Sequence, residues 1–295
     1  MLLSLAAVYT IWGSAYFATH IGLTGFPPFL MAGIRFSSAG VVLYGWLRMR
    51  GVAAPSRQQW FATLPIALLL VVAANGGVVY AQQWVDSSLA AIVLATSPLW
   101  AALFAGIFER WPSKLEWIGL ALGFAGMLLL NGHANLRAHP LAAAALLGGA
   151  ASWSLGSILG RHVHLPAGLM AAASQMVMGG PIMLAVGLCR GEWITHAPNA
   201  HSIMAVAYLA VFSSLVGFSA FTYLIHNTRP ALAMSYSYVN PVVAVILGVV
   251  FLQEAVDPSE VVAIGVILVS VIFIMQGKGA DRPHPMHTAV TAVSD

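Results

Sequence analysis

The hydrophobic residues of this chain gather into ten long apolar stretches, separated by short links that contain proline, glycine or charge. Each stretch is roughly 18 to 24 residues long, enough for an α-helix to cross ~30 Å of hydrocarbon. We therefore predict an all-α integral membrane protein with ten transmembrane helices. The predicted spans are Leu2–Gly22, Pro28–Met49, Trp60–Gln82, Ser87–Phe108, Lys114–Asn131, Leu141–Gly160, Pro166–Cys189, Ser202–Ile225, Ala231–Leu252 and Ser259–Gln276.

Composition excludes a water-soluble fold. The chain is 60% hydrophobic and 7% charged, and its mean hydropathy is +0.86, whereas about a quarter of the residues of a soluble domain are charged. No basic cluster is interleaved with aromatic residues, so we expect no nucleic-acid partner. The partners that remain are the lipid bilayer and a small-molecule solute. We expect the polar tail 278–295 to be disordered and cytoplasmic.

The cations predict how the spans are oriented. If both termini are cytoplasmic, nine of the 12 cations lie in inner loops and only Arg137 and Arg190 lie in outer ones. Such a bias is typical of multi-pass proteins of a bacterial-type inner membrane. The inner cations are Arg48, Arg50, Arg57, Arg110, Lys114, Arg161, Arg229, Lys278 and Arg282.

Weak internal similarity divides the chain into two halves, 1–132 and 141–277. When Pro98 is placed on Pro241, Leu89 aligns with Leu232 and Phe108 with Phe251. Each half would contain five spans, an odd number, so the second half enters the membrane from the opposite side. Two inverted five-helix repeats are typical of transporters. The alternative is that short apolar sequences recur by chance in a chain rich in Leu, Ala and Val.

Pro98 and Pro241 fall within predicted spans, where a proline removes a backbone hydrogen bond. Polar residues directly precede both of them, Ser97 and Asn240. This pattern favours kinked, partly hydrated helices beside a central cavity, because lipid cannot satisfy a freed carbonyl. The alternative is a kink that serves packing alone.

Four segments of the chain carry recognisable motifs: Tyr9–Ser14 (YTIWGS), Arg35–Phe36, Ser97–Leu103 (SPLWAAL) and Asn240–Val245 (NPVVAV) with the following Glu254. Together they resemble the drug/metabolite transporter superfamily, and within it the EamA-type exporters and their YedA-like branch. The resemblance implies ten helices in two inverted repeats, both termini inside, and export of small organic solutes, amino acids among them, through a central cavity. It also implies that helices one, three, four, six, eight and nine line this cavity.

A set of buried polar and aromatic residues is the candidate solute site. Amide and hydroxyl groups can hold an ammonium and a carboxylate, while Trp and Tyr rings can hold an apolar or cationic part. For any single member, a hydrogen bond between helices is an equally good explanation. The candidates are Trp12, Tyr16, Asn75, Tyr80, Ser97, Trp153, Ser157, Tyr223, Tyr236 and Asn240.

Arg35 is the one cation that lies away from the ends of a predicted span. A charge at that depth is costly unless it is paired or hydrated. It could neutralise a substrate carboxylate or a helix end. The alternative is a structural strut that reaches the interface or binds backbone carbonyls.

All nine acidic residues fall at span ends, in links or in the tail. An intramembrane carboxylate is the usual proton or sodium relay of a coupled pump, so the pattern favours facilitated export of amphipathic metabolites. A proton-coupled multidrug or metabolite antiporter is the main alternative.

A membrane enzyme or a channel fits the sequence least well. The chain has neither H-E-x-x-H nor G-x-S-x-G, so we expect no catalytic residue, metal or cofactor. The glycine pairs Gly119/Gly123 and Gly156/Gly160 allow close helix approach, within a monomer or between subunits, and we expect a monomer.

Overall fold

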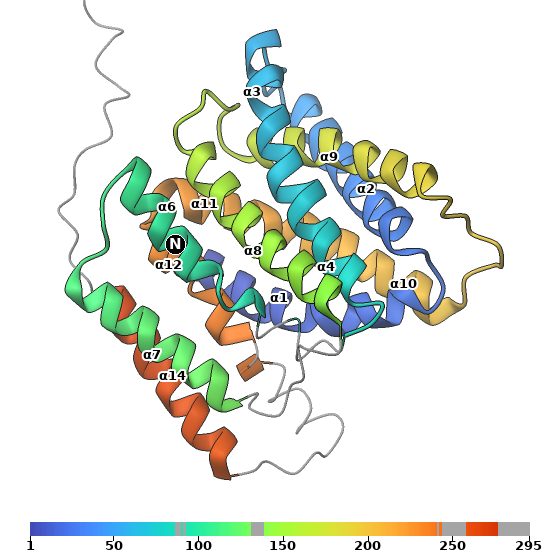
Figure 1. The fold of residues 1–295 in the computed structure, drawn as a ribbon. Helices are drawn as coiled ribbons and strands as arrows, with labels where there is room; N and C mark the ends of the chain where they lie inside the picture. The colour runs from blue at the N-terminus through green and yellow to red at the C-terminus, as the bar shows by residue number, and fades with distance from the viewer. Residues whose placement is uncertain (86–89, 91–92, 131–138, 241, 244–257, 277–295) are drawn as a thin grey trace, which may run out of the picture.

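The protein is described by a computed structural model, which places all residues except 86–89, 91–92, 131–138, 241, 244–257 and 277–295. The described part is helical and contains no strand (Figure 1). Two elements, η1 and η3, are π-helical, and each continues directly from one α-helix into the next. The elements are α1 (Leu2–Leu23), α2 (Pro28–Met49), α3 (Arg57–Ala67), η1 (Leu68–Asn75), α4 (Gly76–Ala81), α6 (Ser97–Phe108), α7 (Lys114–Leu130), α8 (Pro140–Gly160), α9 (Leu169–Cys189), α10 (Ala200–Tyr208), η3 (Leu209–Phe218), α11 (Ser219–Asn227), α12 (Pro230–Met234) and α14 (Pro258–Gln276).

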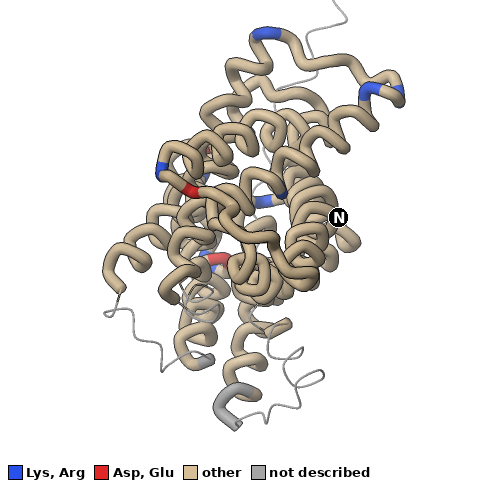
Figure 2. The backbone as a smooth tube through the Cα atoms, turned by 90° about the vertical axis from the view of Figure 1, so that its right-hand side faces the viewer, with Lys and Arg blue, Asp and Glu red and all other residues tan. Residues whose placement is uncertain are grey.

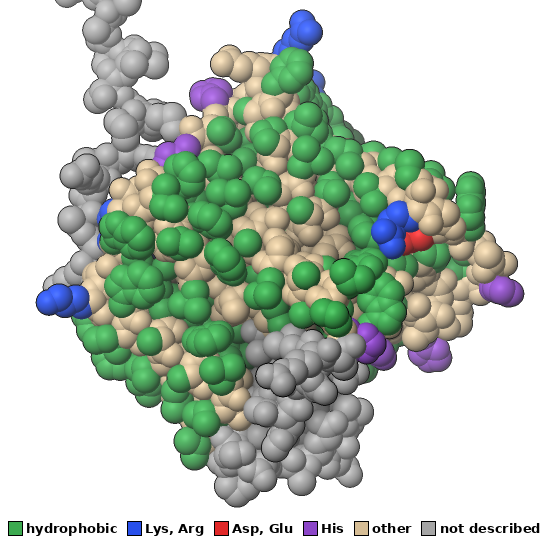
Figure 3. All heavy atoms as spheres, viewed as in Figure 1, with side chains coloured by type: hydrophobic (Ala, Val, Ile, Leu, Met, Phe, Trp, Pro, Cys, Tyr) green, Lys and Arg blue, Asp and Glu red, His purple; other side chains and the backbone are tan. Residues whose placement is uncertain are grey.

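Within the described ranges, six helices are long and apolar enough to cross a membrane, and two of these are the composite helices Arg57–Ala81 and Ala200–Asn227. The same ranges contain two shorter apolar helices, Ser97–Phe108 and Val261–Gln276. Charged residues are sparse along the chain (Figure 2), and the face drawn in Figure 3 is largely hydrophobic. An all-helical membrane protein is thus confirmed, while the count of ten spans and the inverted repeat stay predictions.

Helix starts follow local sequence signals. Proline stands at the first position of α2 and of α8, where its missing N–H costs nothing. Before α3, Ser56 Oγ accepts from the backbone N of Gln59 at 3.2 Å, and Gln59 Oε1 accepts from the backbone N of Ser56 at 2.9 Å. This reciprocal capping box satisfies two donors that the first turn of the helix would otherwise leave free.

The closest helix packing joins the two halves of the chain. Helix α2 packs along α9, and α7 packs along α14 (Figure 1). A Cβ added to Gly40 of α2 would lie 2.7 Å from the backbone N of Val177, and one added to Gly119 of α7 would lie 2.8 Å from the carbonyl of Ser270. Small residues therefore let these backbones approach closely. The Gly119/Gly123 pair contacts α14 and Tyr238 within the chain.

Pro98 does not interrupt a helix as predicted. The chain turns at Ala95–Thr96 and α6 begins at Ser97, so Pro98 lies in the first turn, which needs no donor from it. The carbonyl of Ser97 accepts a hydrogen bond from Ser154 Oγ of α8 at 2.8 Å. Pro241, its predicted counterpart, lies outside the described residues.

Candidate solute cavity

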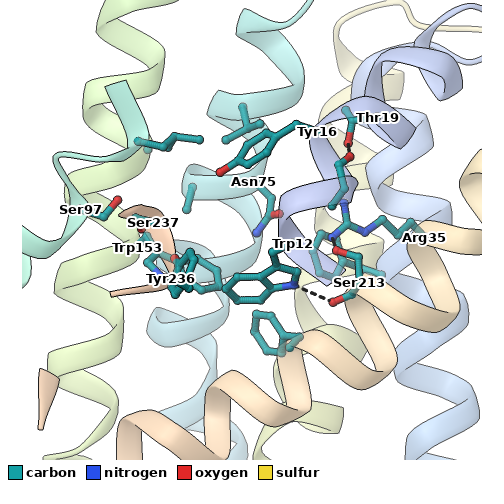
Figure 4. Close-up of a pocket in the computed structure, with 17 residues that line it drawn as sticks. Trp12, Tyr16, Thr19, Arg35, Asn75, Ser97, Trp153, Ser213, Tyr236 and Ser237 are labelled. Atoms are coloured by element: carbon teal, nitrogen blue, oxygen red, sulfur yellow. Dashed lines mark hydrogen bonds between the residues drawn. The ribbon is translucent and has the colours of Figure 1, made fainter. Parts of the chain in front are cut away.

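A cavity of about 90 Å³ lies in the middle of the bundle, between α1, α2, η1 and η3. Residues from both halves of the chain line it, and Figure 4 shows them converging from several helices. The lining combines aromatic rings, hydroxyls, one amide and one guanidinium. The lining residues are Trp12, Ala15, Tyr16, Thr19, Arg35, Phe36, Ala74, Asn75, Val78, Leu94, Ser97, Gly149, Trp153, Ser213, Phe218, Tyr236 and Ser237.

Trp12 is the centre of an aromatic cluster at this cavity. Its ring centroid lies 4.8 Å from that of Tyr236 and 5.4 Å from that of Trp153, both edge-on. It is also 5.4 Å from Phe221, which lies 4.8 Å from Trp153. Edge-on rings at these distances attract one another. The indole of Trp12 is therefore fixed by its neighbours and presents a rigid aromatic surface.

The π-helical elements η1 and η3 each supply one polar residue to the cavity wall. Asn75 closes η1, and its Nδ2 donates to the carbonyl of Leu70 at 2.8 Å. In η3 the carbonyl of Ser213 accepts from Trp12 Nε1 at 3.1 Å (Figure 4). A π-helix shifts the backbone hydrogen-bond register, and such segments are frequent at functional sites. Here the wider turns bring Asn75, Ser213 and Phe218 to the cavity.

Arg35 reaches the cavity from α2 and is only 7% exposed. Its Nε donates to Ser214 Oγ at 2.7 Å and its Nη2 to Ser213 Oγ at 3.0 Å. The guanidinium also lies 4.6 Å from the ring centroid of Phe36. In the described part of the chain, no carboxylate lies within 4.0 Å of it. Two serines thus orient a buried cation whose charge has no described counter-ion.

Six of the predicted site residues line the cavity: Trp12, Tyr16, Asn75, Ser97, Trp153 and Tyr236. Arg35, predicted as a buried charge, lines it as well. In Figure 4, Ser97 and Ser237 lie on one side of this group, and Arg35 and Thr19 lie on the other.

The structure does not bring four predicted residues to the cavity. Tyr223 is 46% exposed, because α11 turns Phe221, Leu224 and Ile225 inward instead. Ser157 is buried, and its Oγ donates to the carbonyl of Trp153 within the same helix at 2.7 Å.

Tyr80 and Asn240 have other neighbours. The ring of Tyr80 packs on Trp84, with 4.7 Å between centroids, nearer the end of the bundle. The side chain of Asn240 hydrogen-bonds with Tyr16, and in the amide orientation that satisfies its neighbours its Nδ2 donates to the carbonyls of Tyr9 and Tyr236 at 3.1 Å each. Asn240 therefore ties α1 to the segment that follows α12.

The candidate set drawn from the sequence leaves out several lining residues, of which Thr19, Ser213 and Ser237 are polar. A signal existed for Ser213, since it and Ser214 form a hydroxyl pair inside an apolar stretch. The register of η3, which decides where this pair points, cannot be read from apolar spacing. Among the described residues, no group of three His, Cys, Asp or Glu could hold a metal ion.

Comparisons with known proteins agree with this architecture. The model of the EamA-like transporter family matches residues 1–132 and 140–276. The uncharacterized inner membrane transporter YedA of Escherichia coli (strain K12) is 42% identical over 276 residues, covering 93% of this chain and 90% of that protein. A WAT1-related chloroplastic protein of Arabidopsis thaliana is 24% identical, covering 94% of this chain and 70% of that protein.

A solved crystal structure superposes with a TM-score of 0.79 at 20% identity, covering 93% of this chain and 97% of the other, which is a likeness of fold. The family match spans nearly the whole chain, and the resemblance noted from its sequence motifs is confirmed. The chain therefore belongs to the EamA-like transporter family.

Proposed function

We propose that this protein exports small amphipathic metabolites, with amino acids as the first candidates, by alternating access through the central cavity. The observation that carries the proposal is Arg35, a buried guanidinium at the cavity wall with no described carboxylate partner. A substrate carboxylate would supply the missing counter-charge. The rings of Trp12, Trp153 and Tyr236 would contact the apolar part of the solute.

The size of the cavity favours a small solute. Pockets that enclose drug-sized molecules measure ~300–1,000 Å³, whereas this cavity measures about 90 Å³. The hydroxyl of Ser97 and the amide oxygen of Asn75 could bind an ammonium or another polar head group.

Alternating access requires two states related by symmetry, which inverted repeats supply. The π-helical elements support this arrangement: η1 starts at Leu68 and η3 at Leu209, 141 positions later (209 − 68), close to the offset of the internal sequence match. The pairing of α2 with α9 and of α7 with α14 joins elements in corresponding positions of the two halves. With both termini cytoplasmic, α3 would begin, and α8 would end, on the cytoplasmic side.

No carboxylate is among the described lining residues, which favours facilitated export over proton coupling. The test is counterflow of radiolabelled amino acids into liposomes that contain the purified protein. We expect saturable counterflow, with no acceleration by an imposed proton gradient beyond that of a membrane-potential control. A strong acceleration would instead support a proton-coupled antiporter, and non-saturable flux would support a channel.

Arg35→Lys tests the role of the guanidinium. Lysine keeps the charge but cannot reproduce the planar fork that donates to Ser213 and Ser214 together. We expect kcat/KM for counterflow to fall by about tenfold or more, equivalent to ~1.4 kcal/mol. Arg48→Lys, at the exposed end of the same helix, should have no effect. Equal activity of both variants would show that a positive charge at this position, without the planar fork, is enough for counterflow.

A further inference from the structure

A second and larger cavity, which we call the vestibule, opens at the end of the bundle where α1 and α4 end. It measures about 570 Å³, and the α9–α10 link forms its other wall. His20, Gln82, Trp193, His196 and Asn199 are among its lining residues. None of its described lining residues is Lys, Arg, Asp or Glu. Its volume falls within the ~300–1,000 Å³ range of small-molecule pockets.

Gln82 is the unusual group in this vestibule. It lies directly after α4 and is only 5% exposed, yet neither its Nε2 nor its Oε1 has a hydrogen-bond partner in the described part of the chain. Its neighbour Gln83 differs, since its Nε2 donates to the carbonyl of Tyr80 at 2.9 Å. Buried amides are nearly always hydrogen-bonded, because desolvation without a partner is costly.

The two described charges of the α9–α10 link, Arg190 and Glu192, are occupied elsewhere. Glu192 Oε2 accepts from the backbone N of Phe29 and of Leu30, each at 3.0 Å. The guanidinium of Arg190 lies 5.2 Å from the ring centroids of Phe29 and of Tyr80. A ligand of the vestibule would therefore meet a neutral surface, and a ligand without net charge fits it best.

The two cavities follow one another along the same helices. Thr19 lines the central cavity and His20, the next residue of α1, lines the vestibule. On the other wall Val78 lines the central cavity, and Gln82, one helical turn further, lines the vestibule. The vestibule therefore lies next to the central cavity along α1 and α4.

We propose that the vestibule is a second solute-binding site, in which Gln82 holds the head group of a zwitterionic amino acid. Gln82 Nε2 donates to the carboxylate, and Gln82 Oε1 accepts from the ammonium. The side chain of the solute packs on the indole of Trp193, which is 66% exposed. This inference rests on the proposed function, because it assumes the same class of solute.

The experiment is equilibrium binding of radiolabelled L-phenylalanine to the purified full chain. We expect two molecules per chain for the wild type and one for Gln82→Leu. Counterflow with L-phenylalanine added on the vestibule side should show a half-saturation concentration raised by about tenfold, as expected when hydrogen bonds to a charged head group are lost. Gln58→Leu is the matched control, since it alters an exposed glutamine at the opposite end of the same composite helix.

Folding of the variants is checked by their melting temperatures. Replacing an unpartnered buried amide by an apolar group should leave the melting temperature of Gln82→Leu unchanged or higher. Gln82→Glu is a second variant, which keeps an acceptor for the ammonium but repels the carboxylate, and it should also bind one molecule per chain.

Two outcomes separate this inference from the proposed function. If the wild type and Gln82→Leu bind the same number of molecules with unchanged half-saturation, the second site is overturned, whereas counterflow through the central cavity still stands. If the wild type neither binds nor transports any amino acid tested, the proposed function fails, and the second site fails with it.

Discussion

The two ends of the helix bundle are held together by different interactions. At the end where α6, α8 and α11 finish, which we call the ion-pair end, Arg161 Nε lies 2.7 Å from Glu109 Oε1. At the same end Arg229 Nη1 lies 3.1 Å from Glu116 Oε1. Each pair joins a carboxylate of the first half of the chain to a guanidinium of the second half. These ion pairs therefore connect the two halves of the chain at this end.

The vestibule end lacks such pairs among the described residues. The carboxylate of Glu192 accepts hydrogen bonds from backbone N–H groups at the start of α2. This position is favourable because a helix N-terminus attracts negative charge. The side chains around the vestibule are neutral or imidazole groups. The vestibule end thus contains a cavity, and the ion-pair end contains ion pairs between the two halves.

The ion pairs at one end indicate that this end must rearrange before a solute can reach the cavity from it. The aromatic cluster around Trp12 and Phe221 lies towards the ion-pair end, since α11 runs from Phe221 to that end. Access to the cavity from there requires both the cluster and the two ion pairs to separate. We therefore expect changes at the ion-pair end to alter stability most, and changes at the vestibule end to alter it least.

The largest expected effect is that of Arg229→Ala. Glu116 is 2% exposed, and Arg229 is its nearer cation and also donates to the carbonyl of Met275 at 2.8 Å. Removing Arg229 leaves this buried carboxylate with only the more distant Arg110 as a cation, which costs about 3 kcal/mol. SDS-induced unfolding in mixed micelles measures the loss of free energy of unfolding.

The matched control for Arg229→Ala is Arg110→Ala. Arg110 lies 3.8 Å from the same carboxylate and is more exposed, so its loss should cost less than ~1 kcal/mol. Equal losses for the two variants would show that the ion pair with Arg229 does not hold the halves together.

A smaller difference in stability is expected between alanine substitutions of two glycines, one nearer each end of the bundle. Alanine at Gly119 of α7, towards the ion-pair end, would place its Cβ 2.6 Å from Ile274 Cγ1, and overpacking of this kind costs about 1–3 kcal/mol. Alanine at Gly148 of α8, towards the vestibule end, meets nothing within 4 Å and should stabilise its helix by ~0.5–1 kcal/mol. Melting temperatures in one detergent should shift in opposite directions, and shifts of the same sign would contradict the packing described.

The smallest expected effect is that of Glu192→Gln. The amide oxygen can still accept from Phe29 and Leu30, but without the charge that favours a helix N-terminus. We expect a loss of about 0.5–1 kcal/mol in the free energy of unfolding, reduced further by salt. A loss as large as that of Arg229→Ala would mean that the vestibule end is tied by charge as strongly as the other end.

Most helix positions could be predicted from apolar length and link residues. The prediction Pro28–Met49 coincides with α2 as described, and its start follows from proline at the first helical position. The start of the helix in the fourth predicted span, Ser87–Phe108, was less predictable. Its apolar run continues through Ala95–Thr96, where the chain turns, because hydropathy does not distinguish a helix from a turn that is buried among other helices.

A residue of the candidate site could be predicted only where its chemical type alone decided whether it lies at the cavity. Trp12, Trp153 and Arg35 are bulky or charged groups that a membrane helix places against other helices or polar groups. Tyr223 has the same chemistry but faces outward, since the direction of a side chain depends on helix rotation and not on residue type.

The sequence by itself determined that this chain is a membrane protein of the EamA-like transporter family, because hydropathy and the motifs around Trp12 and Pro98 are properties of residue order. Only the tertiary structure decided which polar groups meet. The π-helical turns of η1 and η3 rotate Asn75 and Ser213 into one cavity. Helix packing leaves the amide of Gln82 without a described partner. Both outcomes depend on contacts between helices that are distant in the sequence, which no local pattern encodes.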